Sequence, residues 1–471
     1  MILTLLSVGC SFNSYDKTIS EIKITEYRKP DSLHVINEDS VVANTLWQDY
    51  YSDNNLRNLI DSALMRNNLL HNTILQVEKA NEYVKRSKGD FFPNINLNLY
   101  QDQAKISRVD YPYNTHGVGL AVTDWEIDLW GKLRGMKKAK YAALMKEQSI
   151  MQGVKVSLIA NVASLYYKLV GLDAKLKAID EMIEVDEIYL ADLEYRYKSH
   201  SNNDENAVFL SRTVSRGTIA IEQAKAELYK AKSIRPKIEK EIFVTENAIN
   251  LLLSRSEGEI ERSSLDTIMF GEEWSDTISI GVPSDLIRFR PDVMAAEYAI
   301  IEEYSMKDVA KASLYPKLTL RANIATEENL NGSWNDFSTS IIYNLFAGLT
   351  QPVFRKGELT REKRVRELSS NQKVAEFQQT VLSACVEVSN ALMGYKTDRE
   401  IFVSLSKRYD SLFKAYTYSR QLNRTGRTDY IDVLAAQGQL LQTRLDLSDA
   451  LISYYTQRIT LYKALGGGAL Y

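Results

Sequence analysis

Two long stretches without proline constrain this fold more than any other feature of the sequence. No proline occurs between Pro112 and Pro236, and none follows Pro352. Apolar residues recur along the first stretch at a mean spacing near 3.6, at Val154, Leu158, Val162, Leu165, Leu169, Leu172, Leu176, Ile179 and Ile183. That spacing matches a straight α-helix, which from about Lys132 to Lys198 would be roughly 100 Å long. A compact domain has no use for a helix of that length.

The C-terminal stretch carries a second apolar stripe of the same kind. Its members are Leu441, Leu445, Ile452, Tyr455, Ile459 and Tyr462. Such stripes indicate packing between helices. Pro236 falls inside the helix expected to pair with the first one. Because proline removes a backbone hydrogen bond, we expect the helix to kink or end there.

Short segments of alternating apolar and polar residues precede the helices in each half. Residues 94–99 read Asn-Ile-Asn-Leu-Asn-Leu, and the alternation resumes at 118–122. A second pair covers 318–324 and 343–347. They predict two hairpins with strands of about 10 to 14 residues, long enough to span a bilayer at a tilt. No segment approaches the ~20 apolar residues of a transmembrane helix, so a membrane crossing would require a β-barrel.

The two halves of the chain resemble each other. Phe92–Leu97 is similar to Tyr315–Leu320 at an offset of 223, and Leu129–Arg134 is similar to Phe354–Leu359 at an offset of 225 to 226. The common order and near-constant offset indicate a duplication. We expect two repeats, at 47–280 (strands about 92–130, helices about 132–254) and 281–471 (strands about 315–350, helices about 355–466).

The N-terminus resembles the end of a bacterial lipoprotein signal. The run Met1–Gly9 is apolar with small residues at its end, and Cys10 follows. Cleavage would leave Cys10 as an acylated first residue, which makes 1–10 the signal and 11–46 a tether. The alternative is a buried cysteine in an ordinary apolar N-terminus.

Charge and motif content argue against several functions. Lys and Arg number 58 against 61 Asp and Glu, whereas a nucleic-acid binder normally has a basic surplus. The two cysteines are far apart, and none of the four histidines is spaced as a helical zinc ligand pair. Nucleotide-binding and hydrolase motifs are missing. We therefore expect no cofactor, no metal site and no enzyme.

Four strands cannot close a membrane barrel by themselves, because the smallest such barrels have eight. Closure requires several copies, and three copies give twelve strands around a lumen. The expected fold is therefore mixed and mainly α: a homotrimer with a transmembrane β-barrel that long helices continue.

Four segments resemble the TolC-type outer-membrane efflux proteins, in the lipoprotein branch that includes OprM. They are Gly281–Asp292, Leu461–Gly468, Gln351–Phe354 and Trp125–Gly131. The resemblance implies a trimeric channel in the bacterial outer membrane, with a periplasmic helical barrel and a small equatorial region. It also implies an outer-membrane lipid anchor, a periplasmic adaptor, an inner-membrane RND-type pump and no catalytic site.

The turn between the last two helical stretches carries charge. Gly426 can end one helix, and Thr428 or Asp429 can cap the next. If this tip faces a threefold axis, copies of Asp429 and Asp432 form carboxylate rings that favour cations. The resemblance makes this tip the periplasmic entrance, where the side chains of Arg424, Arg427 and Tyr430 would latch the closed state.

Two alternatives differ from an efflux conduit. A channel of a type I protein secretion system would share the fold, since the pump chooses the cargo. A periplasmic coiled-coil scaffold without a pore would have a sustained 3.5-residue repeat and no hairpins, which is the opposite of this sequence. The transported substrate stays open at this stage.

Overall fold

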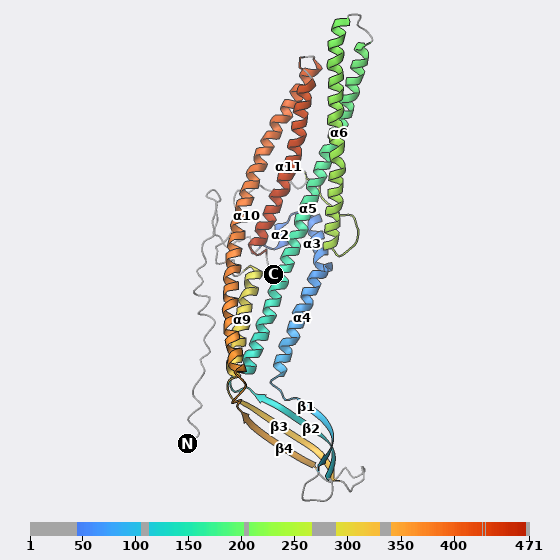
Figure 1. The fold of residues 1–471 in the computed structure, drawn as a ribbon. Coiled ribbons are helices and arrows are strands. Elements are labelled where there is room, and N and C mark those ends of the chain that lie inside the picture. Colours follow the sequence, from blue (N-terminus) through green and yellow to red (C-terminus); the bar gives the residue numbers. More distant parts are fainter. Residues whose placement is uncertain are drawn as a thin grey trace. The chain divides into compact units, whose positions relative to one another are not determined.

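The structure is a computed structural model of the 471-residue chain, and it describes residues 45–104, 113–201, 207–265, 289–329, 341–425, 427–428 and 430–467. Its elements are long helices and one antiparallel sheet (Figure 1). The chain divides into two compact units. Thr73–Met151 and Asp292–Val381 belong to the first, and the second includes Gln152–Pro291 and Leu382–Tyr471. Cys10 lies outside the described residues.

The first unit contains the four expected strands. They are β1 (Ile95–Ala104), β2 (Tyr113–Ile127), β3 (Lys317–Asn329) and β4 (Ile341–Thr350). The strands pair antiparallel in the order β1-β2-β3-β4, so the two hairpins join through β2 and β3. Within the described residues, β1 and β4 each pair on one side only, and the sheet of a single chain therefore keeps two open edges.

Four helices contribute to the first unit. Ala80 and Val84 pack against Leu144, and Lys146 forms an ion pair with Glu302 at 2.7 Å. These contacts join segments that are far apart in sequence. The helices are α4 (Asn68–Gly89), α5 (Lys132–Ser201), α9 (Pro291–Ala312) and α10 (Glu358–Arg424), of which α4, α5 and α10 continue into the second unit.

The second unit packs helices on helices. It adds α2 (Trp47–Tyr50), α3 (Asn54–Arg66), α6 (Ala207–Leu252) and α11 (Tyr430–Ala464) to the continuing helices. Its core takes Leu172 and Ile179 from the first predicted stripe and Leu441 from the second, together with Met182 and Ile238. Tyr167 stacks on Tyr455, with ring centroids 4.3 Å apart. The helical periodicity therefore identified the packing faces correctly.

Pro236 does not end its helix. α6 continues on both sides of this proline. Ile234, Ile238 and Ile242 all pack against the core of the second unit. Burial of these side chains on either side of Pro236 offsets the lost backbone hydrogen bond. Of the two outcomes expected at Pro236, the end of the helix was wrong, because tertiary packing outweighs the local preference, and a kink there stays a prediction.

Cys385 is a buried helical residue, as expected, with 7% of its surface exposed. None of the helices in the described ranges has both the length and the apolar character of a membrane span.

Candidate functional site

One face of the sheet is apolar and exposed. In the register of the four strands, directly paired residues lie in rows on the same face. The middle row is apolar throughout, and its members are 48% to 80% exposed: Leu97, Leu120, Ile324 and Tyr343. Its neighbouring rows begin at Ile95 and Leu99, which are also exposed. The period-two pattern of the sequence therefore becomes a continuous apolar face.

The opposite face carries polar and small residues. One row consists of Asn96, Ala121, Asn323 and Asn344. In the adjacent row, a Cβ atom on Gly119 would lie 2.5 Å from the Cβ of Ala325, which is closer than two carbon atoms can approach. The face therefore leaves no room for a side chain at Gly119. The sheet separates an apolar side from a polar side, as a wall between lipid and water requires.

The second candidate site is the turn between α10 and α11. α10 ends at Arg424, where the backbone N–H groups of Thr425 and Arg427 donate to the Leu422 carbonyl at 3.1 and 3.0 Å. The amide nitrogen of Asn423 donates to the Thr428 carbonyl at 3.0 Å. Hydrogen bonds within the turn thus satisfy backbone groups at the helix end.

The structure describes only some of the residues predicted at the entrance. Arg424, Arg427 and Asp432 are exposed around the turn, whereas Asp429 lies outside the described residues, as does Gly426. The Thr428 hydroxyl donates a hydrogen bond to the carboxylate of Asp432 in the first turn of α11. The tip therefore brings together two cations and one described carboxylate.

Tyr430 packs inside the tip. It is 9% exposed, and its ring stacks on Tyr189 with centroids 4.4 Å apart. Val433, Leu193 and Ala224 belong to the same cluster. The ring of Tyr430 therefore anchors α11 to its neighbours, and a latch through its hydroxyl stays a prediction.

A buried carboxylate lies near this cluster. Asp186 is 6% exposed and accepts a hydrogen bond from the side chain of Gln437. Burial raises the pKa of Asp186 to about 6, the bond from Gln437 opposes this rise, and the charge of Glu227 adds to it. Burial raises the pKa of Tyr416 and that of Tyr430, and the charge of Asp186 adds to the rise at both.

Asp186 was not among the residues predicted from the sequence. A signal is present, because Asp186 lies one turn from Met182 and two turns from Ile179, on the helix face that is buried. An acidic residue on an apolar stripe is a candidate for a perturbed pKa. Its partner, Gln437, is 251 positions away and could not be paired with it by spacing.

The raised pKa of Asp186 makes stability depend on pH. The folded chain holds the Asp186 proton more tightly than the unfolded chain, so protonation of Asp186 stabilises the fold. This contribution is complete below about pH 4 and is lost as the pH rises through about 6. We expect Asp186→Asn to increase the free energy of unfolding by on the order of 1 to 2 kcal/mol at neutral pH and to have no effect near pH 4. Urea denaturation at both pH values measures this.

Glu184→Gln is the matched control, because Glu184 is an exposed carboxylate on the same helix. It should change stability by less than about 0.5 kcal/mol at either pH. If Asp186→Asn and Glu184→Gln gave the same pH profile, burial of Asp186 would have no energetic consequence.

The chain is similar in sequence to known proteins. The family model of the outer membrane efflux proteins matches residues 59–199 and 282–467. The chain is 26% identical over 447 residues to the cation efflux system protein CusC of Escherichia coli, and the match covers 92% of this chain and 90% of CusC. It is 24% identical over 436 residues to the toluene efflux pump outer membrane protein TtgI of Pseudomonas putida, and the match covers 89% of this chain and 87% of TtgI.

A solved structure shares the fold. The open state of the Neisseria gonorrhoeae MtrE outer membrane channel matches with a TM-score of 0.80 and 21% identity, and the match covers 95% of this chain and 98% of MtrE. The expected fold class is thereby confirmed. With a family match over both halves of the sequence, this chain belongs to the outer membrane efflux protein family.

Proposed function

We propose that three copies of this chain form a passive outer-membrane channel that exports small molecules. The observation that carries the proposal is the four-stranded sheet, which has an apolar and a polar face and two unpaired edges within the described residues. Three sheets joined edge to edge supply twelve strands, enough to surround a water-filled lumen. The apolar face then contacts lipid, and the polar face contacts water.

The channel would work as one part of a tripartite system. A periplasmic adaptor and an inner-membrane RND-type pump supply the energy, and the channel itself has no catalytic site. CusC and TtgI support this assignment, since their names describe a cation efflux system and a toluene efflux pump. One fold serves both cargoes, so we infer that the pump selects the cargo and that the channel accepts several kinds.

Two further features belong to the proposal. Acyl chains on Cys10 would anchor the N-terminus in the outer membrane after removal of the preceding residues. At the periplasmic entrance, Asp429 and Asp432 would form the carboxylate rings that set ion preference, while Arg424 and Arg427 hold the closed state.

We also propose that the two repeats arose by duplication. Gly131 and Gly357 are separated by 226 residues, close to the sequence offset, and both have a φ of 78°. Each stands just before a long helix, α5 or α10. A left-handed turn that only glycine adopts without strain thus recurs where a strand gives way to a helix, which supports a division near residue 280.

Mass and conductance test this function together. In detergent, the purified protein should have the mass of three protomers, each lacking residues 1–9 and carrying acyl chains. In planar bilayers it should give discrete ion-conducting steps. A monomer that gives no current would contradict the channel, whereas an unmodified N-terminus would contradict only the anchor.

A further inference from the structure

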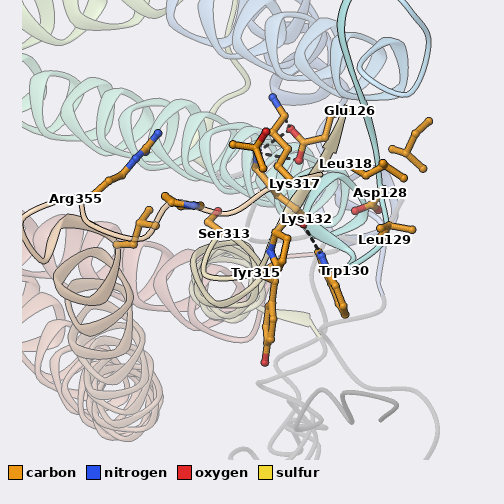
Figure 2. Close-up of a pocket in the computed structure, with 16 residues that line it drawn as sticks. Glu126, Asp128, Leu129, Trp130, Lys132, Ser313, Tyr315, Lys317, Leu318 and Arg355 are labelled. Atoms are coloured by element: carbon orange, nitrogen blue, oxygen red, sulfur yellow. Dashed lines mark hydrogen bonds and ion pairs between the residues drawn. The ribbon is translucent and has the colours of Figure 1, made fainter. Parts of the chain in front are cut away.

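A pocket lies where the sheet meets the helices of the first unit. Its volume is about 320 Å³, and it is lined by the end of β2, the start of β3, the end of β4 and the segments that lead into α5 and α10. Figure 2 shows Glu126, Lys132 and Lys317 gathered on one side of the pocket and Arg355 on another. All of these residues belong to the first unit.

Two of these charged residues lie on the polar face of the sheet. Lys317 and Asn323 are an even number of positions apart on β3, so their side chains are on the same face. Asn323 is a member of the polar row, and Glu126 pairs with Thr319, which is on this face as well. Because the proposed function assigns the polar face to water, Lys317 and Glu126 line the lumen.

The charges of this group do not balance. The Glu126 carboxylate lies 3.0 Å from the ammonium nitrogen of Lys132 and 3.4 Å from that of Lys317. Both distances are measured to the same oxygen, Oε2, so the two ammonium groups also lie close to each other. One carboxylate thus faces two cations, and the group keeps one unbalanced positive charge per chain.

The unbalanced charge belongs to Lys317. Lys132 is the nearer partner of Glu126 and donates to both carboxylate oxygens, at 3.1 and 3.0 Å. The side chain of Lys317 is also the most accessible of the three, at 43% exposed against 35% for Lys132 and 18% for Glu126. Lys132 and Glu126 therefore neutralise each other, and Lys317 presents its charge to water.

Two neighbouring carboxylates are engaged with other cations. Asp128 pairs with the guanidinium of Arg134 at 3.0 Å, and Asp124 pairs with that of Arg321 at 2.6 Å. Within the residues that the structure describes, neither carboxylate lies within ion-pair distance of Lys317. The positive surplus at Lys317 is therefore not cancelled by these groups.

We propose that Lys317 from three chains forms a ring of positive charge that draws anionic solutes into this part of the lumen. Rings of lysine or arginine favour anions in a pore, just as rings of carboxylates favour cations. The pocket beside Lys317 has room for a small anion that carries a carboxylate or a phosphate. The inference rests on the proposed function, because it requires three chains around a water-filled lumen.

Two substitutions change the surplus charge in opposite directions. Lys317→Gln removes the surplus and leaves Lys132 paired with Glu126, whereas Glu126→Gln leaves two cations without their carboxylate. Lys317→Arg is the matched control, because it keeps the charge at the same position. The reversal potential of the purified channel, measured in a KCl gradient across a planar bilayer, gives the permeability ratio of chloride to potassium for each protein.

The expected shifts follow from the ring of three like charges. For charges roughly 10 Å from a permeating ion, with a Debye length of about 10 Å at about 0.1 M salt, Lys317→Gln should lower the chloride-to-potassium ratio about twofold. Glu126→Gln should raise the ratio by a similar factor, and Lys317→Arg should match the parent. Both shifts should disappear near 1 M salt, where the Debye length falls to about 3 Å.

A purely structural ion cluster predicts a different result. If the three side chains only hold the strand ends together, Lys317→Gln and Glu126→Gln both lower stability and leave the permeability ratio of the parent unchanged. Equal ratios in all four proteins at low salt, or shifts of the same sign for the two substitutions, would overturn the ring. If Glu126→Gln does not fold, the comparison of Lys317→Gln with Lys317→Arg decides. A conducting parent with unshifted variants removes only the ring, whereas a parent without conductance removes the proposed function itself.

Discussion

We expect that replacement of both Asp429 and Asp432 by alanine will raise the single-channel conductance and weaken cation selectivity. The two residues are spaced i,i+3 at the start of the last helix, and Asp432 is exposed there. If these carboxylates hold the closed entrance through Arg424 and Arg427, loss of even one charge-assisted hydrogen bond of about 1.5 kcal/mol shifts the ratio of open to closed states roughly tenfold. Loss of the rings also removes the charge that attracts cations.

The same helix offers a matched control for this result. Asp446 and Asp449 repeat the i,i+3 spacing about 25 Å further along α11. Asp446→Ala/Asp449→Ala removes the same charge away from the turn and should leave the conductance and the reversal potential of the parent unchanged in planar bilayers. Identical behaviour of the two double variants would eliminate Asp429 and Asp432 as entrance residues.

We expect Tyr166→Ala to destabilise the second unit by about 3 to 5 kcal/mol, the usual cost of removing a large buried aromatic side chain. Tyr166 is 0% exposed. Its hydroxyl donates to the Asp53 carboxylate at 2.5 Å and accepts from the backbone N–H of Ser263 at 3.0 Å. The substitution leaves a cavity, an unpaired N–H group and an Asp53 carboxylate that has lost one of its three donors, the others being the Asn55 N–H and the Ser263 hydroxyl. Urea denaturation followed by circular dichroism measures the loss.

Two companion substitutions divide this cost. Tyr166→Phe keeps the ring and removes the hydroxyl, so we expect a smaller loss of about 1 to 3 kcal/mol. Tyr195→Ala is the surface control, because Tyr195 lies on the same helix and is 74% exposed, and it should cost less than about 0.5 kcal/mol. Equal losses for Tyr166→Ala and Tyr195→Ala would refute the packing argument.

Much of the architecture could be predicted because its signals are local. A spacing near 3.6 identified the buried face of α5, and strict alternation from Asn94 to Leu99 identified a strand with one apolar face. Pro236 shows where local reasoning fails. Its effect on the backbone is local, but packing of Ile234 and Ile238 decided that the helix continues.

The candidate sites could be predicted only in part. The turn at Arg424–Asp432 was found because its charges are adjacent in sequence, between two helices. Burial of Tyr430 against Tyr189 was not found, because the two residues are 241 positions apart and belong to different helices. Tyrosine suits both an exposed hydroxyl latch and a buried ring, and its packing partner distinguishes the two.

Local residue patterns were sufficient to predict the elements of this protein: long helices, two hairpins and the apolar face of each. Periodicity along the chain is enough to predict these elements, since it depends only on residues that are close together in sequence. Only the tertiary structure brought Glu126 between Lys132 and Lys317, and Asp186 beside Gln437. Charge balance and burial depend on which distant segments meet, and no local pattern in the chain encodes that meeting.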